Sequence, residues 1–443
     1  MLVALDDTDS VDGMCTTYLP TELIRRTGLD VIGYPRLVRL NPNISYKTRG
    51  NGAVVLRLGM GKGRKFPVGR ISGKQVFGYE SLKGEASRQE LLDISSEIIG
   101  EFAVMEQEST NPGLVVSGSR PPESLYREAV SKEISAQYVE DILMEAGANY
   151  RKFKNGRGVI GASSAMSWSP GRRTYELLVY QYPRPGSVDR DLQLEAAAFI
   201  EEHYQETFNN IDVKNRHAAI FPSNRTPVVY GVRSVNPVIL PQIEQELRTR
   251  YGIGGTSYLI YETNQGTDDH IIHSPDIIWE KGSFSITGEV VDTPVPIQGG
   301  HYFAQMKWKK SRIGLAAFEP TKEFRSVFRE LRPGDIVEAT GSLSEGTLKV
   351  EKMHVISVSR YFKRVPPMCQ NCARRMKTHG RNDFRCKSCG GKKITPEYAE
   401  EARSLLPGKY EVPVSARRHL SMPLKLEEHF ALAEMSGRNG GPA

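Results

Sequence analysis

Three carboxylates lie close together near the start of the chain. Residues 1–5 form an apolar run that predicts a buried strand, and Asp6, Asp7 and Asp9 follow directly. Like charges at such short spacing repel and raise each other's pKa. A bound divalent cation offsets this cost, because Mg²⁺ favours carboxylate oxygens together with substrate phosphates. A solvated turn, in which Asp and Ser side chains bond to the backbone, is the alternative that these residues leave open.

A glycine-rich basic segment, Lys47-Thr48-Arg49-Gly50-Asn51-Gly52, is the second candidate for phosphate chemistry. Lysine and arginine neutralise phosphate oxygens, and glycine permits close approach of the backbone. Residues 61–65 and 72–75 also contain Gly-Lys pairs, but neither has the spacing of a Walker loop. A basic hairpin turn is the alternative for residues 47–52.

Four of the five cysteines form a Cys-x₂-Cys-x₁₃-Cys-x₂-Cys pattern, made of Cys369, Cys372, Cys386 and Cys389. Two such thiolate pairs bind tetrahedral Zn²⁺, and a site with four cysteine ligands is structural rather than catalytic. Many lysines and arginines surround the pattern, which favours a zinc ribbon that binds nucleic acid. A ribbon that contacts another protein is the alternative. Metal binding also fits a reducing compartment better than disulfides do.

Length and charge limit the class of protein. The chain has 443 residues, too many for one core, and 59 basic against 52 acidic residues give a net charge of +7. This mild excess is compatible with a nucleic-acid partner. No apolar run approaches the ~18 residues that cross a bilayer, and the N-terminus does not resemble a signal peptide. The sequence therefore predicts a cytoplasmic protein without a membrane partner; protein partners stay unknown.

The elements that would position these residues divide the chain into five parts. Alternating strands and helices predict an α/β domain over residues 1–150, with one helix from Leu125 to Glu145. Residues 59–86, rich in Gly, Lys and Arg, predict a mobile basic insertion within it. Over residues 151–278, two helices against several strands suit a ferredoxin-like α+β layer.

The second half of the chain predicts smaller modules. Five short strands with one internal helix over residues 279–362 follow the order of an OB-fold barrel, and another small β-barrel is the alternative. Residues 363–395 form the zinc ribbon, and residues 396–443 form a C-terminal extension.

Longer strings of sequence resemble one family, the archaeal tRNA(Ile) 2-agmatinylcytidine synthetases (the TiaS family). They run nearly end to end and in order, so they are far more specific than any short motif. The strings are Asp6–Ser10, Gly13–Leu19, Arg36–Pro42, Tyr46–Val54, Thr110–Gly113, Gly156–Ala162, Val229–Arg233, Ala316–Lys322 and Pro413–Leu420.

The resemblance implies both an activity and a fold. The family attaches agmatine to C2 of cytidine 34, the first anticodon position of a tRNA(Ile) with a CAU anticodon, and consumes ATP. Its fold combines a kinase-like catalytic domain, a ferredoxin-like domain, an OB-fold and a zinc ribbon. Because the C2 oxygen of cytosine is a poor leaving group, we expect its phosphorylation to precede displacement by the amine.

The resemblance also implies roles for particular residues. Asp6, Asp7 and Asp9 are its catalytic acids, expected to hold Mg²⁺ against ATP. Thr16 matches a threonine that accepts a phosphate from ATP, although a threonine at the start of a helix is the alternative.

Two further groups are expected to bind substrates. Lys47 and Arg49 are expected to hold phosphates, with Gly50 and Asn51 beside them in the same segment. Asp268 and Asp269 are candidates for the guanidinium of agmatine, with a capping turn as the alternative.

Two other functions stay open from the sequence alone. Another ATP-dependent RNA kinase or amine transferase could use the same acidic site. A non-enzymatic protein could bind nucleic acid through the barrel and the ribbon, but this function leaves the clustered carboxylates without a role.

Overall fold

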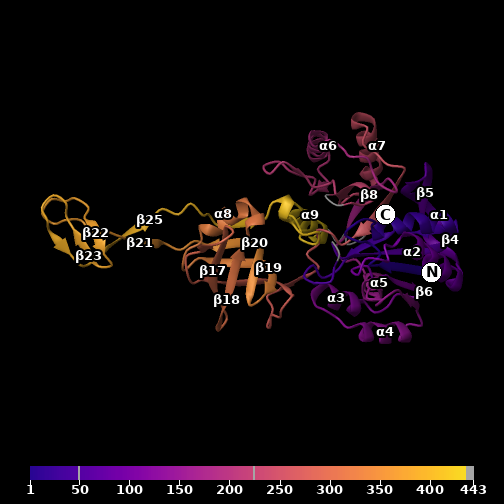
Figure 1. The fold of residues 1–443 in the computed structure, drawn as a ribbon, viewed down its shortest axis with the longest axis horizontal. Coiled ribbons are helices and arrows are strands. Elements are labelled where there is room, and N and C mark those ends of the chain that lie inside the picture. Colours follow the sequence, from indigo (N-terminus) through magenta and orange to yellow (C-terminus); the bar gives the residue numbers. More distant parts are fainter. Residues whose placement is uncertain (48–49, 223–224, 436–443) are drawn as a thin grey trace. The chain divides into compact units, whose positions relative to one another are not determined.

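The structure is a computed structural model, and it describes residues 1–47, 50–222 and 225–435. The chain divides into two compact units (Figure 1). The first unit contains Met1–Ile272, Ile278–Ser283 and the chain from Pro413 onward. The second unit contains His273–Ile277 and Phe284–Val412. The second unit is therefore an insertion, after which the chain returns to the first.

One mixed sheet of 11 strands forms the first unit, with the main order β7-β6-β1-β4-β3-β13-β8-β12-β9 and with β2 and β5 beside β4. Its strands are β1 (Leu2–Asp6), β2 (Asp30–Ile32), β3 (Arg36–Arg39), β4 (Gly52–Ile71), β5 (Lys74–Glu85), β6 (Gly113–Ser117), β7 (Asn149–Lys152), β8 (Thr174–Tyr180), β9 (Thr207–Phe208), β12 (Val228–Ser234) and β13 (Ser257–Thr263). A separate ladder pairs β10 (Ile211–Asp212) with β11 (His217–Ala218).

Helices cover both faces of this sheet (Figure 1). The α-helices are α1 (Leu19–Thr27), α2 (Arg88–Phe102), α3 (Glu123–Ser131), α4 (Ala136–Glu145), α5 (Gly158–Ser167), α6 (Arg190–His203), α7 (Leu240–Tyr251) and α9 (Leu424–Met435). Short 3₁₀ helices are η1 (Thr16–Tyr18), η2 (Pro237–Ile239) and η4 (Val414–Ala416).

Successive apolar side chains of β1 point to opposite faces of the sheet, which explains why both of its faces are covered. Val3 and Leu5 pack into a core with α1 and α2, whereas Ala4 points to the opposite core with α3 and α5. A third core lies between α6, α7 and the strands β8, β12 and β13. Because both faces of β1 are buried, its last residue and the acidic loop after it are held on a rigid element.

The region predicted as a mobile insertion is instead a paired hairpin, with three shifts of register along it. Strands β4 and β5 pair from Gly59 with Glu85 to Ile71 with Lys74. Its glycines allow close packing across the pair: a Cβ at Gly61 would lie 2.3 Å from the ring of Tyr79. The Gly-, Lys- and Arg-rich composition of residues 59–86 predicted irregular structure, because composition alone does not reveal which side chains pack across a strand pair.

The single helix predicted from Leu125 to Glu145 is also wrong, because the chain breaks into α3 and α4. Lys132 is extended at the end of α3. The hydroxyl of Ser135 then accepts a hydrogen bond from the backbone N–H of Tyr138 at 3.2 Å and caps α4.

Strand β6 and helix α5 approach so closely that Gly113 leaves no space for a side chain. A Cβ at Gly113 would lie 1.9 Å from the backbone nitrogen of Val159. We expect Gly113→Ala to lower the free energy of unfolding by about 3 kcal/mol, at the upper end of overpacking costs. Gly100→Ala in α2 is the matched control, because nothing lies within 4 Å of its Cβ and alanine favours helix. Denaturant unfolding of both variants checks this; equal stabilities would contradict it.

The second unit contains a closed barrel of five strands, in the order β15-β19-β20-β18-β17 and back to β15. Strands β14, β16 and β26 extend its sheet, and α8 packs against β17 and β18. The elements are β14 (Ile271–His273), β15 (Ser283–Val290), β16 (Val295–Ile297), β17 (His301–Trp308), β18 (Ser311–Ala317), η3 (Glu319–Thr321), α8 (Glu323–Arg329), β19 (Ile336–Ser344), β20 (Thr347–Ser357) and β26 (Gly408–Glu411).

The cysteine region follows the barrel as two small sheets. Strands β22, β23 and β24 form one sheet, and β21 pairs with β25 in the other. Their bounds are β21 (Tyr361–Val365), β22 (Lys377–Gly380), β23 (Asp383–Arg385), β24 (Lys392–Lys393) and β25 (Glu397–Glu401). Among all helices in the described ranges, none combines the length and apolar character needed to cross a membrane.

Candidate active site

A cavity of about 480 Å³ opens in the first unit. It is lined by the acidic loop after β1, by η1, by residues between Leu40 and Lys47 and between Gly50 and Gly52, by the start of α5 and by residues of the C-terminal segment. Acidic and basic side chains both line it. Among the described residues these are Asp6, Asp7, Asp9, Glu133 and Glu176, with Arg39, Lys47, Lys132, Arg157, Arg233, Arg417 and Arg418.

The structure brings the three predicted acids to this cavity. Asp6 lies so close to α5 that a Cβ at Gly161 would stand 1.7 Å from its Oδ2. Asp7 adopts a left-handed backbone conformation (φ 56°), and its Oδ2 lies 3.9 Å from Nη2 of Arg157. Asp9 lines the same cavity.

Burial makes the charged forms of these acids costly. Burial, followed by the Asp7 carboxylate, raises the pKa of Asp6 well above its usual value. Burial also raises the pKa of Asp7 to about 7, although Arg157 acts in the opposite direction. A cation in the cavity would favour the ionised forms and so offset this cost.

The three aspartates do not by themselves form a complete set of metal ligands. In the described ranges, only the four cysteines bring at least three ligand atoms of His, Cys, Asp or Glu within 4.8 Å of one another. This spacing of the aspartates fits Mg²⁺ bound by one or two carboxylates plus substrate phosphates, its usual arrangement in nucleotide sites.

Thr16 also lines the cavity, in the 3₁₀ turn η1 that precedes α1. Its side chain is buried, and its Oγ1 lies 3.1 Å from the donating hydroxyl of Thr8. No cap bond forms at this helix start, where Cys15 is the N-cap residue. The hydroxyl of Thr16 therefore accepts a hydrogen bond from Thr8 and does not cap the helix.

The basic segment reaches the cavity with Lys47, Gly50 and Asn51; Arg49, predicted to hold phosphate, lies outside the described residues. The ammonium of Lys47 donates to the backbone carbonyls of Pro42 (2.6 Å) and Ile44 (3.0 Å). Within the described residues, these two bonds leave one N–H of the ammonium for a ligand.

Asp268 and Asp269 are not among the residues that line the cavity. Oδ1 of Asp268 accepts a hydrogen bond from the backbone of Met422 at 2.7 Å. Oδ2 of Asp269 accepts one from the hydroxyl of Tyr126 at 2.7 Å. Both carboxylates thus accept hydrogen bonds from other parts of the protein, and their binding of the guanidinium of agmatine stays a prediction.

A charged cluster that the sequence did not predict lies in the cavity wall. Oε1 of Glu176 lies 3.0 Å from Nε of Arg233, and its Oε2 lies 4.0 Å from Nη2 of Arg39. Nε of Arg233 also donates to Gln265, which contacts His419. The strings Arg36–Pro42, Val229–Arg233 and Pro413–Leu420 contain three of these residues, but only the fold shows that they meet.

The C-terminal segment is built into the wall of the cavity. The hydroxyl of Ser415 donates to Asp212, and the backbone carbonyl of His419 accepts from Gly266 at 2.9 Å. Beyond it, Met422, Leu426 and Phe430 pack against Phe208. The segment is therefore anchored on both sides of its cavity-lining residues.

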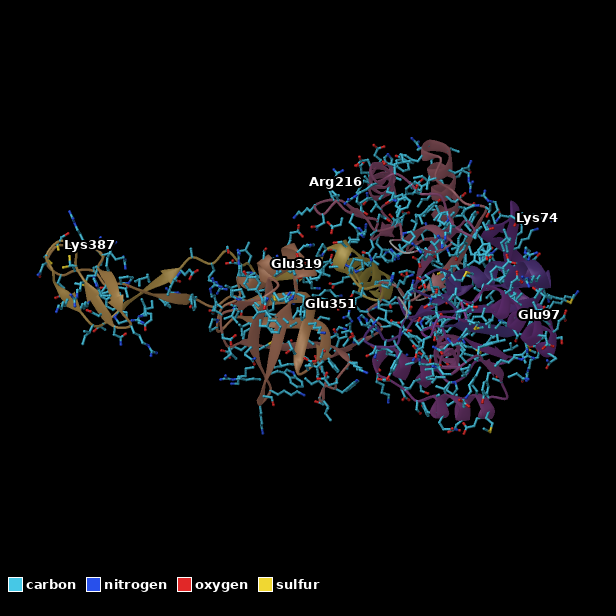
Figure 2. All side chains as sticks on the ribbon, in the orientation of Figure 1. Lys74, Glu97, Arg216, Glu319, Glu351 and Lys387 are labelled. Atoms are coloured by element: carbon cyan, nitrogen blue, oxygen red, sulfur yellow. The ribbon has the colours of Figure 1, made fainter. Side chains whose placement is uncertain are left out.

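The four cysteines predicted as zinc ligands converge in the second unit. The Sγ of Cys372 lies 3.3 to 3.5 Å from those of Cys369, Cys386 and Cys389. Backbone N–H groups of Cys389 and Ser388 lower the pKa of Cys386 to about 6, which favours the thiolate that binds metal. Four convergent thiols fit a structural Zn²⁺. Lys387 projects from this ribbon (Figure 2).

Together, these features define a multidomain mixed α/β protein with a charged cavity in one unit and a closed barrel and a four-cysteine ribbon in the other. Family models match residues 2–155 (TiaS TCKD domain), 156–270 (TiaS FLD domain) and 366–405 (TiaS C-terminal zinc ribbon domain). The chain belongs to the TiaS family, as its sequence predicted.

Relatives and solved structures cover nearly the whole chain. The isoleucine-tRNA 2-agmatinylcytidine synthetase TiaS of Thermoplasma volcanium is 46% identical over 97% of this chain and 98% of its own. That of Archaeoglobus fulgidus is 36% identical over 95% and 96%. A complex of TiaS with its isoleucine tRNA and ATP (TM-score 0.78, 34% identity) and a complex of TiaS with that tRNA, AMPCPP and agmatine (0.76, 30%) each align over 96% of both chains.

Proposed function

We propose that this protein is a ligase that attaches agmatine to C2 of cytidine 34 in a tRNA(Ile) with a CAU anticodon, at the expense of ATP. The observation that carries the proposal is that buried acidic side chains and several basic side chains line the same cavity. Membership of the TiaS family and the likeness to complexes with an isoleucine tRNA, ATP and agmatine support it.

The proposed reaction has two steps, through a phosphorylated cytidine. In the first, phosphate is placed on the C2 oxygen; in the second, the amine of agmatine displaces it. Asp6, Asp7 and Asp9 supply carboxylates for a bound Mg²⁺, which would neutralise charge on the ATP phosphates. In this proposal Thr16 accepts a phosphate, and Lys47, with Gly50 and Asn51 beside it, binds phosphate oxygens; all four residues line the cavity.

We further propose a separate function for each domain. A kinase-like domain (1–150) and a ferredoxin-like domain (151–278) build the cavity together with residues of the C-terminal extension. The barrel is an OB-fold (279–362) that binds tRNA together with the zinc ribbon (363–395), before the extension from residue 396. A soluble tRNA substrate places the reaction in the cytoplasm. The aromatic and basic surfaces typical of such modules bind RNA by stacking and by charge.

One assay tests this function. The protein is incubated with ATP, Mg²⁺, agmatine and a tRNA(Ile) transcript with a CAU anticodon, and the digested nucleosides are weighed by mass spectrometry. We expect 2-agmatinylcytidine only when ATP and agmatine are both present, and none from a transcript with uridine at position 34. Unmodified cytidine under conditions where the tRNA binds would falsify the proposal. Without agmatine, label from γ-³²P ATP is expected on the tRNA.

A further inference from the structure

The hydrogen-bond network around Glu176 fixes the orientation of a buried amide. Nε2 of Gln265 donates to Oε2 of Glu176. A carboxylate at neutral pH only accepts hydrogen bonds, so the amide nitrogen must face Glu176. Oε1 of Gln265 therefore points the other way, toward Nε of Arg233 (3.1 Å) and Nδ1 of His419 (2.9 Å).

This orientation determines which nitrogen of His419 carries the proton. Because Oε1 of Gln265 can only accept, Nδ1 of His419 must be the donor. Arg39, burial and Arg233 together lower the pKa of His419 well below its usual value, so the imidazole is neutral. The lone pair of the neutral ring is therefore on Nε2.

Nε2 of His419 is available to a ligand. His419 lines the cavity, and within the described part of the chain its Nε2 makes no hydrogen bond. Gly50 keeps the approach open, because a Cβ there would lie 3.1 Å from Nε2 and 2.7 Å from Nη1 of Arg39. The cavity thus contains a neutral hydrogen-bond acceptor, Nε2 of His419, beside the guanidinium groups of Arg39 and Arg233.

We propose that Nε2 of His419 accepts the proton that the amine of agmatine releases as it bonds to C2 of cytidine; this rests on the proposed function. The nitrogen–C2 bond forms, and the C2–O bond breaks. The oxygen leaves with the phosphate that came from ATP, and one proton moves from the amine nitrogen to Nε2.

The two arginines beside His419 fit the same step. Agmatine reaches the cavity as an ammonium, which cannot attack. Positive charge nearby disfavours the protonated form of an amine, as in other enzymes that activate amines beside a second cation. Arg39 and Arg233 thereby favour the free amine. The anionic phosphate that leaves offsets their positive charge, which allows the imidazole of His419 to take up the proton in this step.

The variant His419→Asn tests this role. The asparagine amide keeps a donor near the position of Nδ1, so the bond to Gln265 can persist, but it removes Nε2. We expect agmatine attachment to slow about 10²- to 10⁴-fold, the usual contribution of a general base. Transfer of ³²P from ATP to tRNA without agmatine should stay within about twofold of wild type, because that step releases no amine proton.

A substrate with a less basic amine distinguishes a role of His419 in proton transfer from a role in positioning the substrate. With an aminooxy analogue of agmatine, the bonded nitrogen is more acidic, and the defect of His419→Asn should shrink about tenfold or more. Imidazole should partly restore His419→Ala. Equal defects for both amines would overturn the proposal, as would loss of phosphate transfer, which would place His419 in ATP binding. Absence of agmatine attachment by the wild type would instead reject the proposed function.

Discussion

Replacing Asp7 with asparagine is expected to abolish agmatine attachment, by about 10³-fold or more, while tRNA affinity changes less than about twofold. Asn tolerates the left-handed backbone of Asp7 (φ 56°) better than other residues and keeps the shape of the side chain. The variant removes only the negative charge of Asp7, which we propose to hold a cation at bound ATP. Nucleoside analysis and filter binding with labelled tRNA measure the two effects separately.

The stability of this variant gives an independent readout. The pKa of Asp7 rises from its ordinary value of 3.8 to about 7 in the folded protein, so the unfolded chain loses this proton first as pH rises. The free energy of unfolding therefore falls as pH rises between these two values, and does not recover above them. Asp7→Asn cannot ionise and should unfold at a higher temperature than wild type at a pH above about 7.

Asp12→Asn is the matched control for this prediction. Asp12 is exposed, belongs to the same loop and is not among the residues that line the cavity. It should keep full activity. If Asp7→Asn instead unfolds at a lower temperature and loses tRNA binding and chemistry in parallel, the acids serve the fold and not the reaction.

Replacing Cys369 with serine is expected to release zinc and weaken tRNA binding about tenfold or more. A structural zinc contributes about 10–16 kcal/mol of binding free energy, which small ribbons need in order to fold. The local core supports this, because Cys369, Met376, Phe384 and Cys386 form a small cluster of their own. Few other apolar contacts can replace the metal.

Zinc content by mass spectrometry and tRNA affinity in parallel check this prediction. Cys15→Ser, in the first unit, is the control and should leave one zinc per chain in place. Loss of zinc without any change in tRNA affinity would mean that the ribbon has another task. Since the cavity lies in the first unit, ATP binding should persist in either variant.

Local patterns predicted the parts of this protein that depend on neighbouring residues. The strand before Asp6 follows from an apolar run, and the cysteine site follows from spacing alone. The five barrel strands and their helix were predicted in order, helped by the alternation of buried and less buried residues along much of β17 and β20.

Features that depend on distant residues could not be predicted in the same way. The hairpin of β4 and β5 is stabilised by pairing between residues that composition alone describes as loop-forming. The contact between Gln265 and His419 joins positions 154 residues apart. Neither residue has neighbours in sequence that reveal its partner, so the charged cluster of the cavity is visible only in the fold.

The return of the chain to the first unit at Pro413 has a consequence for synthesis on the ribosome. Residues before Ser283 leave the ribosome first and can begin to fold while the second unit is still being translated. Translation of Phe284–Val412 takes on the order of ten seconds, and only afterwards does His419 become available to Gln265. The nascent protein therefore stays without a complete cavity until almost its whole length has been made.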